Sequence, residues 1–160
     1  MPDYSSMCAR KLSNLGFQPS QQWMTRKDVS VSENGKTYTL RLQPPKRCAV
    51  YQVDGNIISE GQKCDKLVLI DDEKGKGTIF VELKGKDISH AIDQLEATLI
   101  NGIFRIRFDR TDLIRARIVT GGSGPASSSN LTLSNAKVRF LTKYNCDLRV
   151  LKSRQPDSPV

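Results

Sequence analysis

Two strand-like runs of apolar residues lie near the middle of the chain, on either side of a short polar segment. Residues 63–70 and 77–85 are rich in leucine and β-branched side chains, and residues 71–76 between them are charged and contain glycine. This pattern is typical of an antiparallel hairpin. A turn centred in the polar segment pairs Leu67 with Phe80.

Helical spacing follows the hairpin. Asp87 is a suitable N-cap for a helix over residues 88–100. Its predicted buried stripe consists of Ile88, Ala91, Ile92, Leu95 and Leu99. Strand-like residues then occupy 104–108 and 113–120, and a glycine- and serine-rich loop follows at 121–129.

A second helix and a last strand are predicted in the C-terminal part. The helix is indicated by an apolar face formed by Leu133, Ala136, Phe140, Leu141 and Tyr144. Residues 146–151 are typical of a strand. The alternation of strands and helices predicts an α/β fold. The tail 153–160 contains two prolines, and we expect it to be disordered.

The N-terminal part predicts a helix and a separate hairpin. Residues 4–17 favour a short helix in which Met7, Leu12 and Leu15 are partly buried. Residues 29–40 alternate around Asn34-Gly35, a strong hairpin signal that sets Val31 against Tyr38. Pro44-Pro45 should break the chain before another strand at 48–53.

Two acidic side chains meet at one end of the predicted central hairpin. Its register sets Asp65 opposite Glu82, with Cβ atoms about 4.5 to 5.5 Å apart, and Lys84 shares their face. Two carboxylates this close repel each other, and a hard divalent cation such as Mg²⁺ would compensate their charge. The cation would activate a water and stabilise charge on a phosphate, while Lys84 would orient that water. Asp65, Glu82 and the main-chain carbonyl of Leu83 are the candidate ligands.

These residues resemble the motif of the PD-(D/E)XK, or restriction-endonuclease-like, nucleases, which have an acid at the start of one strand and acid-x-lysine on its hairpin partner. Asp65 and Glu82-Leu83-Lys84 match the motif, and Cys64 stands where the family name has proline. The resemblance covers about residues 46–152. It implies a restriction-endonuclease-like core, with a mixed central β-sheet flanked by helices, and Mg²⁺- or Mn²⁺-dependent hydrolysis of nucleic acid. Residues 1–45 would be an N-terminal extension made of the helix and the β-hairpin.

Two further residues are candidates for this site. The resemblance suggests Gln94, because a helix glutamine contacts the site in several branches of the family; an ordinary place on the flank of the helix is the alternative. Asp54 either shapes a turn or serves as a reserve acid. The family often adds a glutamate from its first helix, but residues 4–17 contain none.

The charge of the chain indicates a polyanionic partner. Among 160 residues, 25 Lys and Arg against 17 Asp and Glu give a net charge of +8. The length and the hydrophobic content of 38% suit one domain over residues 1–152. We expect nucleic acid, DNA rather than RNA, to be contacted through its phosphates by Lys46, Arg47, Arg105, Arg107, Arg115 and Arg117. The alternative is that these charges are only solvated.

Cysteine spacing and hydropathy exclude other classes of function. Cys8, Cys48, Cys64 and Cys146 have no Cys-x-x-Cys spacing, so a zinc site is not expected and reduced thiols in a cytoplasm are the simplest interpretation. We expect neither a leader nor a membrane span, because no long apolar run occurs.

Three functional interpretations remain open. The first is a metal-dependent nuclease, whose small size suggests a homodimer or a larger assembly, because cutting two strands usually needs two sites. The second is a catalytically idle domain of the same fold that binds nucleic acid or a protein assembly. The third is an interaction protein whose charge is incidental.

Overall fold

The computed structural model describes residues 12, 14–71, 77–83, 87–101, 104, 114–121 and 130–158. The strands are β1 (Gln21–Glu33), β2 (Lys36–Gln52), β3 (Lys66–Ile70), β4 (Thr78–Leu83), β5 (Ile114–Thr120), β6 (Cys146–Lys152) and β7 (Pro156–Asp157). In the described residues they form one mixed sheet of seven strands, accompanied by the helices α2 (Ile88–Ile100) and α4 (Asn130–Tyr144). The strand order is β1-β2-β3-β4-β5-β6, and β7 pairs with β2. The α/β class is therefore confirmed.

The central hairpin has the predicted register. β3 and β4 are antiparallel, and Leu67 lies opposite Phe80. Every side chain of β4 is buried, because this part of the sheet is covered on both faces. Continued by one residue beyond β3, the register brings Asp65 to the level of Glu82.

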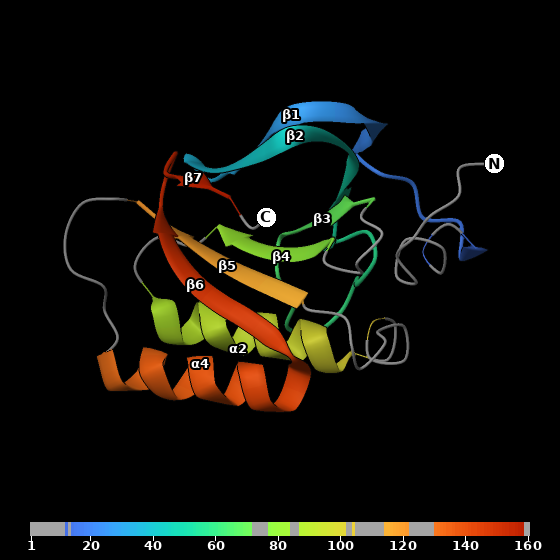
Figure 1. The fold of residues 1–160 in the computed structure, drawn as a ribbon. Helices are drawn as coiled ribbons and strands as arrows, with labels where there is room; N and C mark the ends of the chain where they lie inside the picture. Colours follow the sequence, from blue (N-terminus) through green and yellow to red (C-terminus); the bar gives the residue numbers. More distant parts are fainter. Residues whose placement is uncertain are drawn as a thin grey trace.

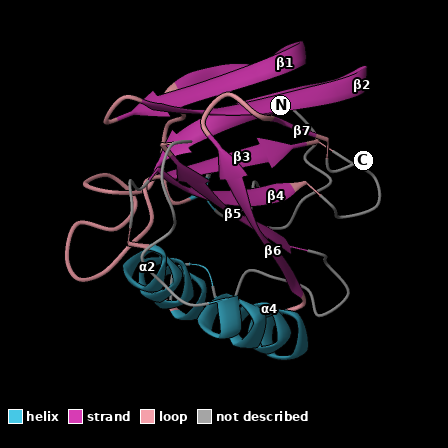
Figure 2. Ribbon diagram, turned by 90° about the vertical axis from the view of Figure 1, so that its left-hand side faces the viewer, coloured by secondary structure: helices cyan, strands magenta, loops and turns pink. Residues whose placement is uncertain are grey.

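The second half of the sheet is parallel. β5 lies between β4 and β6, and both pairings are parallel. α2 connects β4 to β5 and α4 connects β5 to β6, as crossovers between parallel strands require. Both helices lie on the same side of the sheet (Figures 1 and 2) and enclose the larger core. The strands predicted at 113–120 and 146–151 are confirmed to within a residue. Of the strand predicted at 104–108, Phe104 is helical, so the prediction is wrong there, and 105–108 lie outside the described residues.

Both predicted helices form, and one apolar position differs. Asp87 caps α2, since its Oδ1 accepts a hydrogen bond from the backbone N–H of His90 at 2.9 Å. The predicted stripe of α2 is buried, and Thr98 is buried with it. In α4, Phe140 is fully buried but Leu141 is 55% exposed, so the prediction for Leu141 is wrong. One residue turns the helix by about 100°, which carries Leu141 away from the core once Phe140 fills it.

A second hairpin covers the face of the sheet opposite the helices. β1 and β2 are antiparallel, with Val31 opposite Tyr38 as predicted. Their apolar side chains share a second core with β3, β4 and residues from β5 and β6. Figure 1 shows this hairpin arching over the sheet on the side away from α2 and α4. The sheet is thus enclosed between two helices and a hairpin.

The predicted break at Pro44-Pro45 is wrong. β2 continues through both prolines, and the strand predicted at 48–53 is its second half. Opposite the prolines, the register of β1 and β2 shifts between Arg26 and Asp28. Such a bulge leaves residues out of the ladder, so it tolerates a proline without an N–H and bends the strand. The bend lets one hairpin both extend the sheet and cross its face.

The two ends of the chain also differ from expectation. Most of the helix predicted at 4–17 lies outside the described residues; Leu12 is fully buried and Leu15 is exposed. The predicted disorder of the tail is wrong for residues 153–158. There, β7 pairs in parallel with β2, and the Asp157 side chain is buried between the hairpin and the sheet.

Candidate active site

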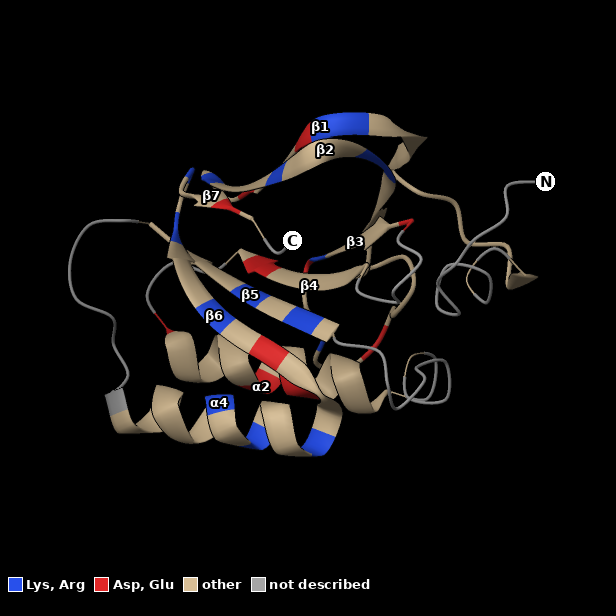
Figure 3. Ribbon diagram, viewed as in Figure 1, with Lys and Arg blue, Asp and Glu red and all other residues tan. Residues whose placement is uncertain are grey.

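The carboxylate of Asp65 is bonded to the end of β4. The backbone N–H of Leu83 donates to Asp65 Oδ2 at 2.8 Å, and the carbonyl of Asp65 accepts from the N–H of Val53 at 3.0 Å. Asp65 is half-buried, whereas the Glu82 side chain is completely buried. The two predicted acids therefore lie at the same end of the central hairpin, where β4 ends in an acidic position (Figure 3).

The predicted lysine of the motif, Lys84, lies outside the described residues. Leu83, whose carbonyl was predicted as a ligand, is buried in β4, and its N–H is taken up by Asp65. Of the predicted motif, the structure therefore describes the two carboxylates and the backbone bond that ties one of them to the adjacent strand.

Glu33 joins these acids from the other hairpin, and sequence reasoning missed it. It is the last residue of β1, and its Oε2 lies 3.8 Å from Lys66 Nζ. Burial, and then the negative charge of Asp65, raise the pKa of the Glu33 carboxyl; hydrogen bonding with Asp65 raises it further. In the sequence, the only indication of the position of Glu33 is the Asn34-Gly35 turn, which places this residue at a hairpin tip. The bend that turns the tip toward Asp65 depends on distant contacts.

Asp54 lies at the outer side of this group of acids. It forms an isolated bridge with Ile58 in the turn after β2, and its half-exposed carboxylate lies 3.7 Å from Lys63 Nζ. The charge of Asp54 also raises the pKa of Glu33. We call Glu33, Asp54, Asp65 and Glu82 the acidic cluster. Lys63 and Lys66 provide positive charge at its rim.

α2 supplies two polar side chains beside the acidic cluster. Gln94 Nε2 donates to the carbonyl of Lys63 at 3.2 Å, while Gln94 Oε1 is buried and has no hydrogen-bond partner among the described residues. Thr98 Oγ1 accepts from the N–H of Cys64 at 2.8 Å. The Gln94 amide therefore binds the segment that precedes Asp65, and its membership of a site stays a prediction. Sequence reasoning did not identify Thr98.

The thiol of Cys64, the residue before Asp65, is buried. Cys64 has no exposed surface. Burial raises its pKa, and the charges of Glu82 and Asp65 raise it further, against a lowering by a hydrogen bond with Thr98. Burial and the neighbouring carboxylates therefore disfavour the thiolate, which is the nucleophilic form of cysteine.

Two arginines predicted to contact phosphate lie in the interior, and that prediction is wrong. Arg115 and Arg117 share one face of β5, as alternation requires, but the β1–β2 hairpin and β7 cover this face. Arg117 has no exposed surface and Arg115 is 7% exposed; burial and the charge of Arg117 lower the pKa of Arg115. Figure 3 shows the basic positions of β5, the strand between β4 and β6.

The Arg117 guanidinium is held by a set of buried partners. Its Nε donates to Asp157 Oδ2 at 2.8 Å, and Nη1 donates to the carbonyl of Asp147 at 2.7 Å. Tyr38 also donates its hydroxyl to Asp157 Oδ2, at 2.6 Å. Burial and the charge of Asp157 raise the pKa of Tyr38 well above its usual value, so the hydroxyl stays a donor. Because it is fully buried and bonded to interior partners, Arg117 is a structural residue.

Lys46 and Arg47, two of the other predicted contacts, retain access to solvent. Lys46 and Arg47 are half-buried in β2, and the Arg47 guanidinium lies 5.3 Å from the centroid of the Trp23 ring. Contact of this pair with nucleic acid stays a prediction. Arg105 and Arg107 lie outside the described residues.

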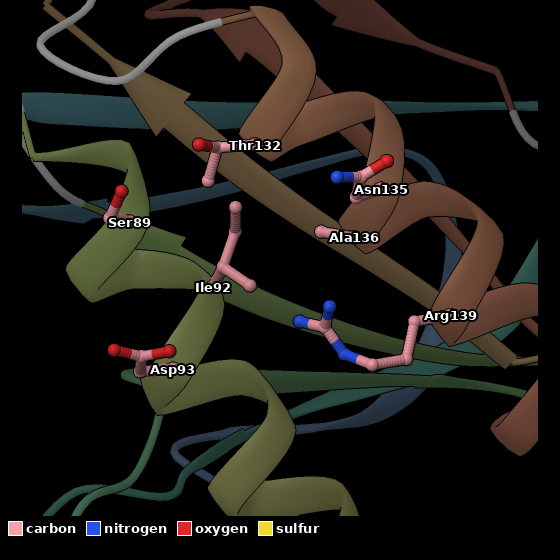
Figure 4. Close-up of a pocket in the computed structure, with 7 residues that line it drawn as sticks. All are labelled: Ser89, Ile92, Asp93, Thr132, Asn135, Ala136 and Arg139. Carbon is pink, nitrogen blue, oxygen red and sulfur yellow. The ribbon is translucent and has the colours of Figure 1, made fainter.

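A cleft between the helices is separate from the acidic cluster. Its volume is about 240 Å³. Figure 4 shows α2 and α4 on its two sides, with the lining residues Ser89, Ile92, Asp93, Thr132, Asn135, Ala136 and Arg139. The Arg139 guanidinium is bonded to Glu96 at 3.1 Å. This ion pair joins the two helices, so Arg139 in the lining of the cleft has a structural role.

The chemistry of the acidic cluster suits a hard cation. Carboxylate oxygens are the donors that Mg²⁺ and Mn²⁺ prefer, and Mg²⁺ commonly takes one or two carboxylates and fills its other positions with water and phosphate oxygens. Among the described residues, no group of three or more His, Cys, Asp and Glu side chains has the arrangement of a metal site. Asp65 and Glu82 supply two carboxylates of the kind that such a cation takes, and among the described residues they do not form a closed structural site.

Comparison with protein-family models, with curated proteins and with solved structures finds no match to this chain. In the described part of the chain, no helix has the length and apolar character needed to cross a membrane. Cys48, Cys64 and Cys146 are buried free thiols.

Proposed function

We propose that the protein is a metal-dependent nuclease of the PD-(D/E)XK type that hydrolyses phosphodiester bonds, with DNA favoured over RNA and a cytoplasmic location. The observation that supports this proposal most is the 2.8 Å hydrogen bond from the Leu83 N–H to the Asp65 carboxylate. It ties Asp65, the residue before β3, to Leu83, the middle residue of the acid-x-lysine motif at the end of β4. The mixed sheet with two helices on one face is consistent with such a core.

In the proposed mechanism, the carboxylates of Asp65 and Glu82 would hold the divalent cation, with the carbonyl of Leu83 as a candidate third ligand. When bound, the cation supplies an activated water and neutralises charge on the scissile phosphate. Asp65 is positioned by its bond to the Leu83 N–H, and Glu82 is positioned by its burial in β4. Lys84 would orient the attacking water.

Recognition of the substrate is proposed to be largely electrostatic. The net charge of +8 favours a polyanion, and contacts to phosphates give affinity without reading sequence. Since Arg115 and Arg117 are interior, solvent-accessible basic residues such as Lys46 and Arg47 are the better candidates for this contact. Binding should weaken steeply as salt rises.

The test is cleavage of labelled duplex, junction, single-stranded DNA and RNA with Mg²⁺ or Mn²⁺, by the wild type and by Asp65→Asn, Glu82→Gln and Lys84→Ala. Each substitution should lower the cleavage rate by about 100-fold or more, because it removes transition-state stabilisation of several kcal/mol. Asp28→Asn, at an exposed position of β1, is the matched control and should cleave like the wild type. Wild-type protein that cleaves no substrate, or cleavage that survives all three substitutions, would refute the proposal.

The idle-domain alternative gives a different result in a binding experiment. Titration of Mn²⁺ followed by calorimetry should show binding that Asp65→Asn abolishes if the proposal is correct. A protein that shifts labelled DNA in a gel but binds no Mn²⁺ would be an idle nucleic-acid-binding domain. A protein that does neither would be an interaction protein whose charge is incidental.

A further inference from the structure

Two side chains of α2 hold the peptide unit that precedes Asp65. Gln94 Nε2 donates to the carbonyl of Lys63 at 3.2 Å, and Thr98 Oγ1 accepts from the N–H of Cys64 at 2.8 Å. These two backbone groups belong to one peptide plane. One turn of α2 therefore binds both polar ends of the 63–64 peptide, which fixes the direction in which the chain enters Asp65.

The hydroxyl of Thr98 is oriented by a second bond. Thr98 Oγ1 donates its only proton to the carbonyl of Gln94, four residues earlier, at 2.8 Å. A hydroxyl has one donor and two acceptor lone pairs, so its donation inside the helix leaves a lone pair for the Cys64 N–H. Buried backbone N–H groups need a partner, and both Thr98 and Cys64 have no exposed surface. The Thr98 hydroxyl therefore accepts a hydrogen bond from the peptide before Asp65 and donates one within α2.

The segment that Thr98 holds has little regular structure of its own. Residues 59–65 connect a turn to β3, and Gly61 within them has a positive φ of 79°. After Asp65, the chain is fixed by pairing with β2 and β4. Before Asp65, the described side-chain bonds to this backbone come from Lys63 itself and from Gln94 and Thr98 of α2. The described side-chain hydrogen bonds that reach this backbone from outside the segment thus come from α2.

We infer that Thr98 is a positioning residue for the Asp65 carboxylate: through the N–H of Cys64, it holds Asp65 where the carboxylate meets Leu83 and can bind the cation. This inference rests on the proposed function. Gln94 has the same positioning role, because it binds the carbonyl of the same peptide. Misplacement of a reacting group by about 1 Å can cost about 100-fold in rate. The loss of the Thr98 hydroxyl should therefore weaken metal binding and slow cleavage.

The experiment compares Thr98→Val, which keeps the shape and removes the hydroxyl, with Thr98→Ser, which keeps the hydroxyl. Thr142→Val is the matched control, because Thr142 also donates to a carbonyl four residues earlier, in α4, but is exposed. Three quantities are measured well below the unfolding temperature of each variant: the Mn²⁺ dissociation constant by calorimetry, the Mg²⁺-dependent cleavage rate, and exchange of the Cys64 amide hydrogen by NMR.

In Thr98→Val we expect about tenfold weaker Mn²⁺ binding, at least tenfold slower cleavage and faster exchange of the Cys64 amide. Thr98→Ser and Thr142→Val should stay within about twofold of the wild type in metal binding and cleavage. If Thr98→Val exchanges faster at Cys64 yet binds Mn²⁺ and cleaves like the wild type, Thr98 is only structural and the inference fails alone. If the wild type binds no Mn²⁺ and does not cleave, the proposed function fails and the inference fails with it.

Discussion

The two groups of charged side chains in this protein differ in how their charges are balanced. Around Arg117, one buried guanidinium meets the carboxylates of Asp157 and Asp147, and Tyr38 donates to Asp157. In the acidic cluster, Asp65 and Asp54 act on the Glu33 carboxyl, Lys63 and Lys66 lie at the rim, and Glu82 is buried in β4. In the first group, positive and negative charges pair with each other. In the second, neighbouring carboxylates raise the pKa of Glu33.

This difference separates structural charge from charge available for chemistry. Removing one partner of a buried ion pair strongly destabilises the fold, because the other charge is left buried without compensation. Carboxylates in contact with each other compete for a shared proton or cation, so their arrangement is useful when a cation binds. Sequence alone would rank the two groups in the opposite order, since Arg115 and Arg117 resemble a basic surface and Glu33 resembles an ordinary turn residue.

Arg117→Met should produce the largest effect on folding. It leaves Asp157 buried without its guanidinium partner, which we expect to lower the free energy of unfolding by about 3–5 kcal/mol. Urea unfolding followed by circular dichroism measures the change. Arg149→Met is the control, because Arg149 pairs with the same Asp147 but its side chain is 57% exposed; it should cost less than about 1 kcal/mol. Equal losses in the two variants would show that the Arg117 group is no anchor of the fold.

Tyr38→Phe should have an intermediate effect. It removes the 2.6 Å bond to Asp157 but leaves the Arg117 pair in place, so we expect a loss of about 2 kcal/mol, as for hydrogen bonds to charged groups. Tyr144→Phe is the comparison, because Tyr144 donates to the partly exposed Glu96 at 2.8 Å. It should lose less in the same urea experiment. A larger loss for Tyr144→Phe would contradict the expectation that the buried bond to Asp157 stabilises the fold more than the partly exposed bond to Glu96.

Glu33→Gln should have the smallest effect, with the opposite sign. The pKa of Glu33 is raised above the ordinary value of 4.5, so its contribution to stability is full below about pH 4.5 and is lost as the pH rises through the folded-state pKa. At pH 7 without divalent cations, the variant should therefore be more stable than the wild type, by less than about 1 kcal/mol because the side chain is a third exposed.

Urea unfolding of Glu33→Gln and wild type at pH 4 and pH 7, both in a chelator, measures this difference. The gain should be present at pH 7 and absent at pH 4. Glu60→Gln, at an exposed position in the segment before β3, should show no such change. A variant that is less stable than the wild type at pH 7 would mean that Glu33 is favourably paired and does not belong to a group of repelling acids.

Local patterns predicted the parts of the fold that depend on neighbouring residues. The register of β3 and β4, the Asp87 cap and the stripe of α2 follow from side-chain spacing and a short turn. The same spacing is enough to bring Asp65 to the level of Glu82. The predicted nuclease activity and its metal remain proposals.

Contacts between distant residues account for what the patterns missed. Arg117 alternates with apolar residues as a half-exposed strand would, and its burial depends on Asp157, forty residues later. The place of Glu33 depends on the bend of β2, where two prolines suggested a break instead. In the sequence, Thr98 resembles any other helix residue, and its role depends on the peptide before Asp65 lying beside it.

The pairing of Arg117 with Asp157 also sets an order for folding during synthesis. The ribosome adds about 5–20 residues per second, so β5 emerges seconds before residue 157. The helix side of the sheet can pack once β6 is complete, because its core comes from residues up to Leu148 and from Val150 beside it. The hairpin side gains the partner of its buried guanidinium only when β7 arrives. A nascent chain should therefore keep the β1–β2 hairpin loosely attached until then.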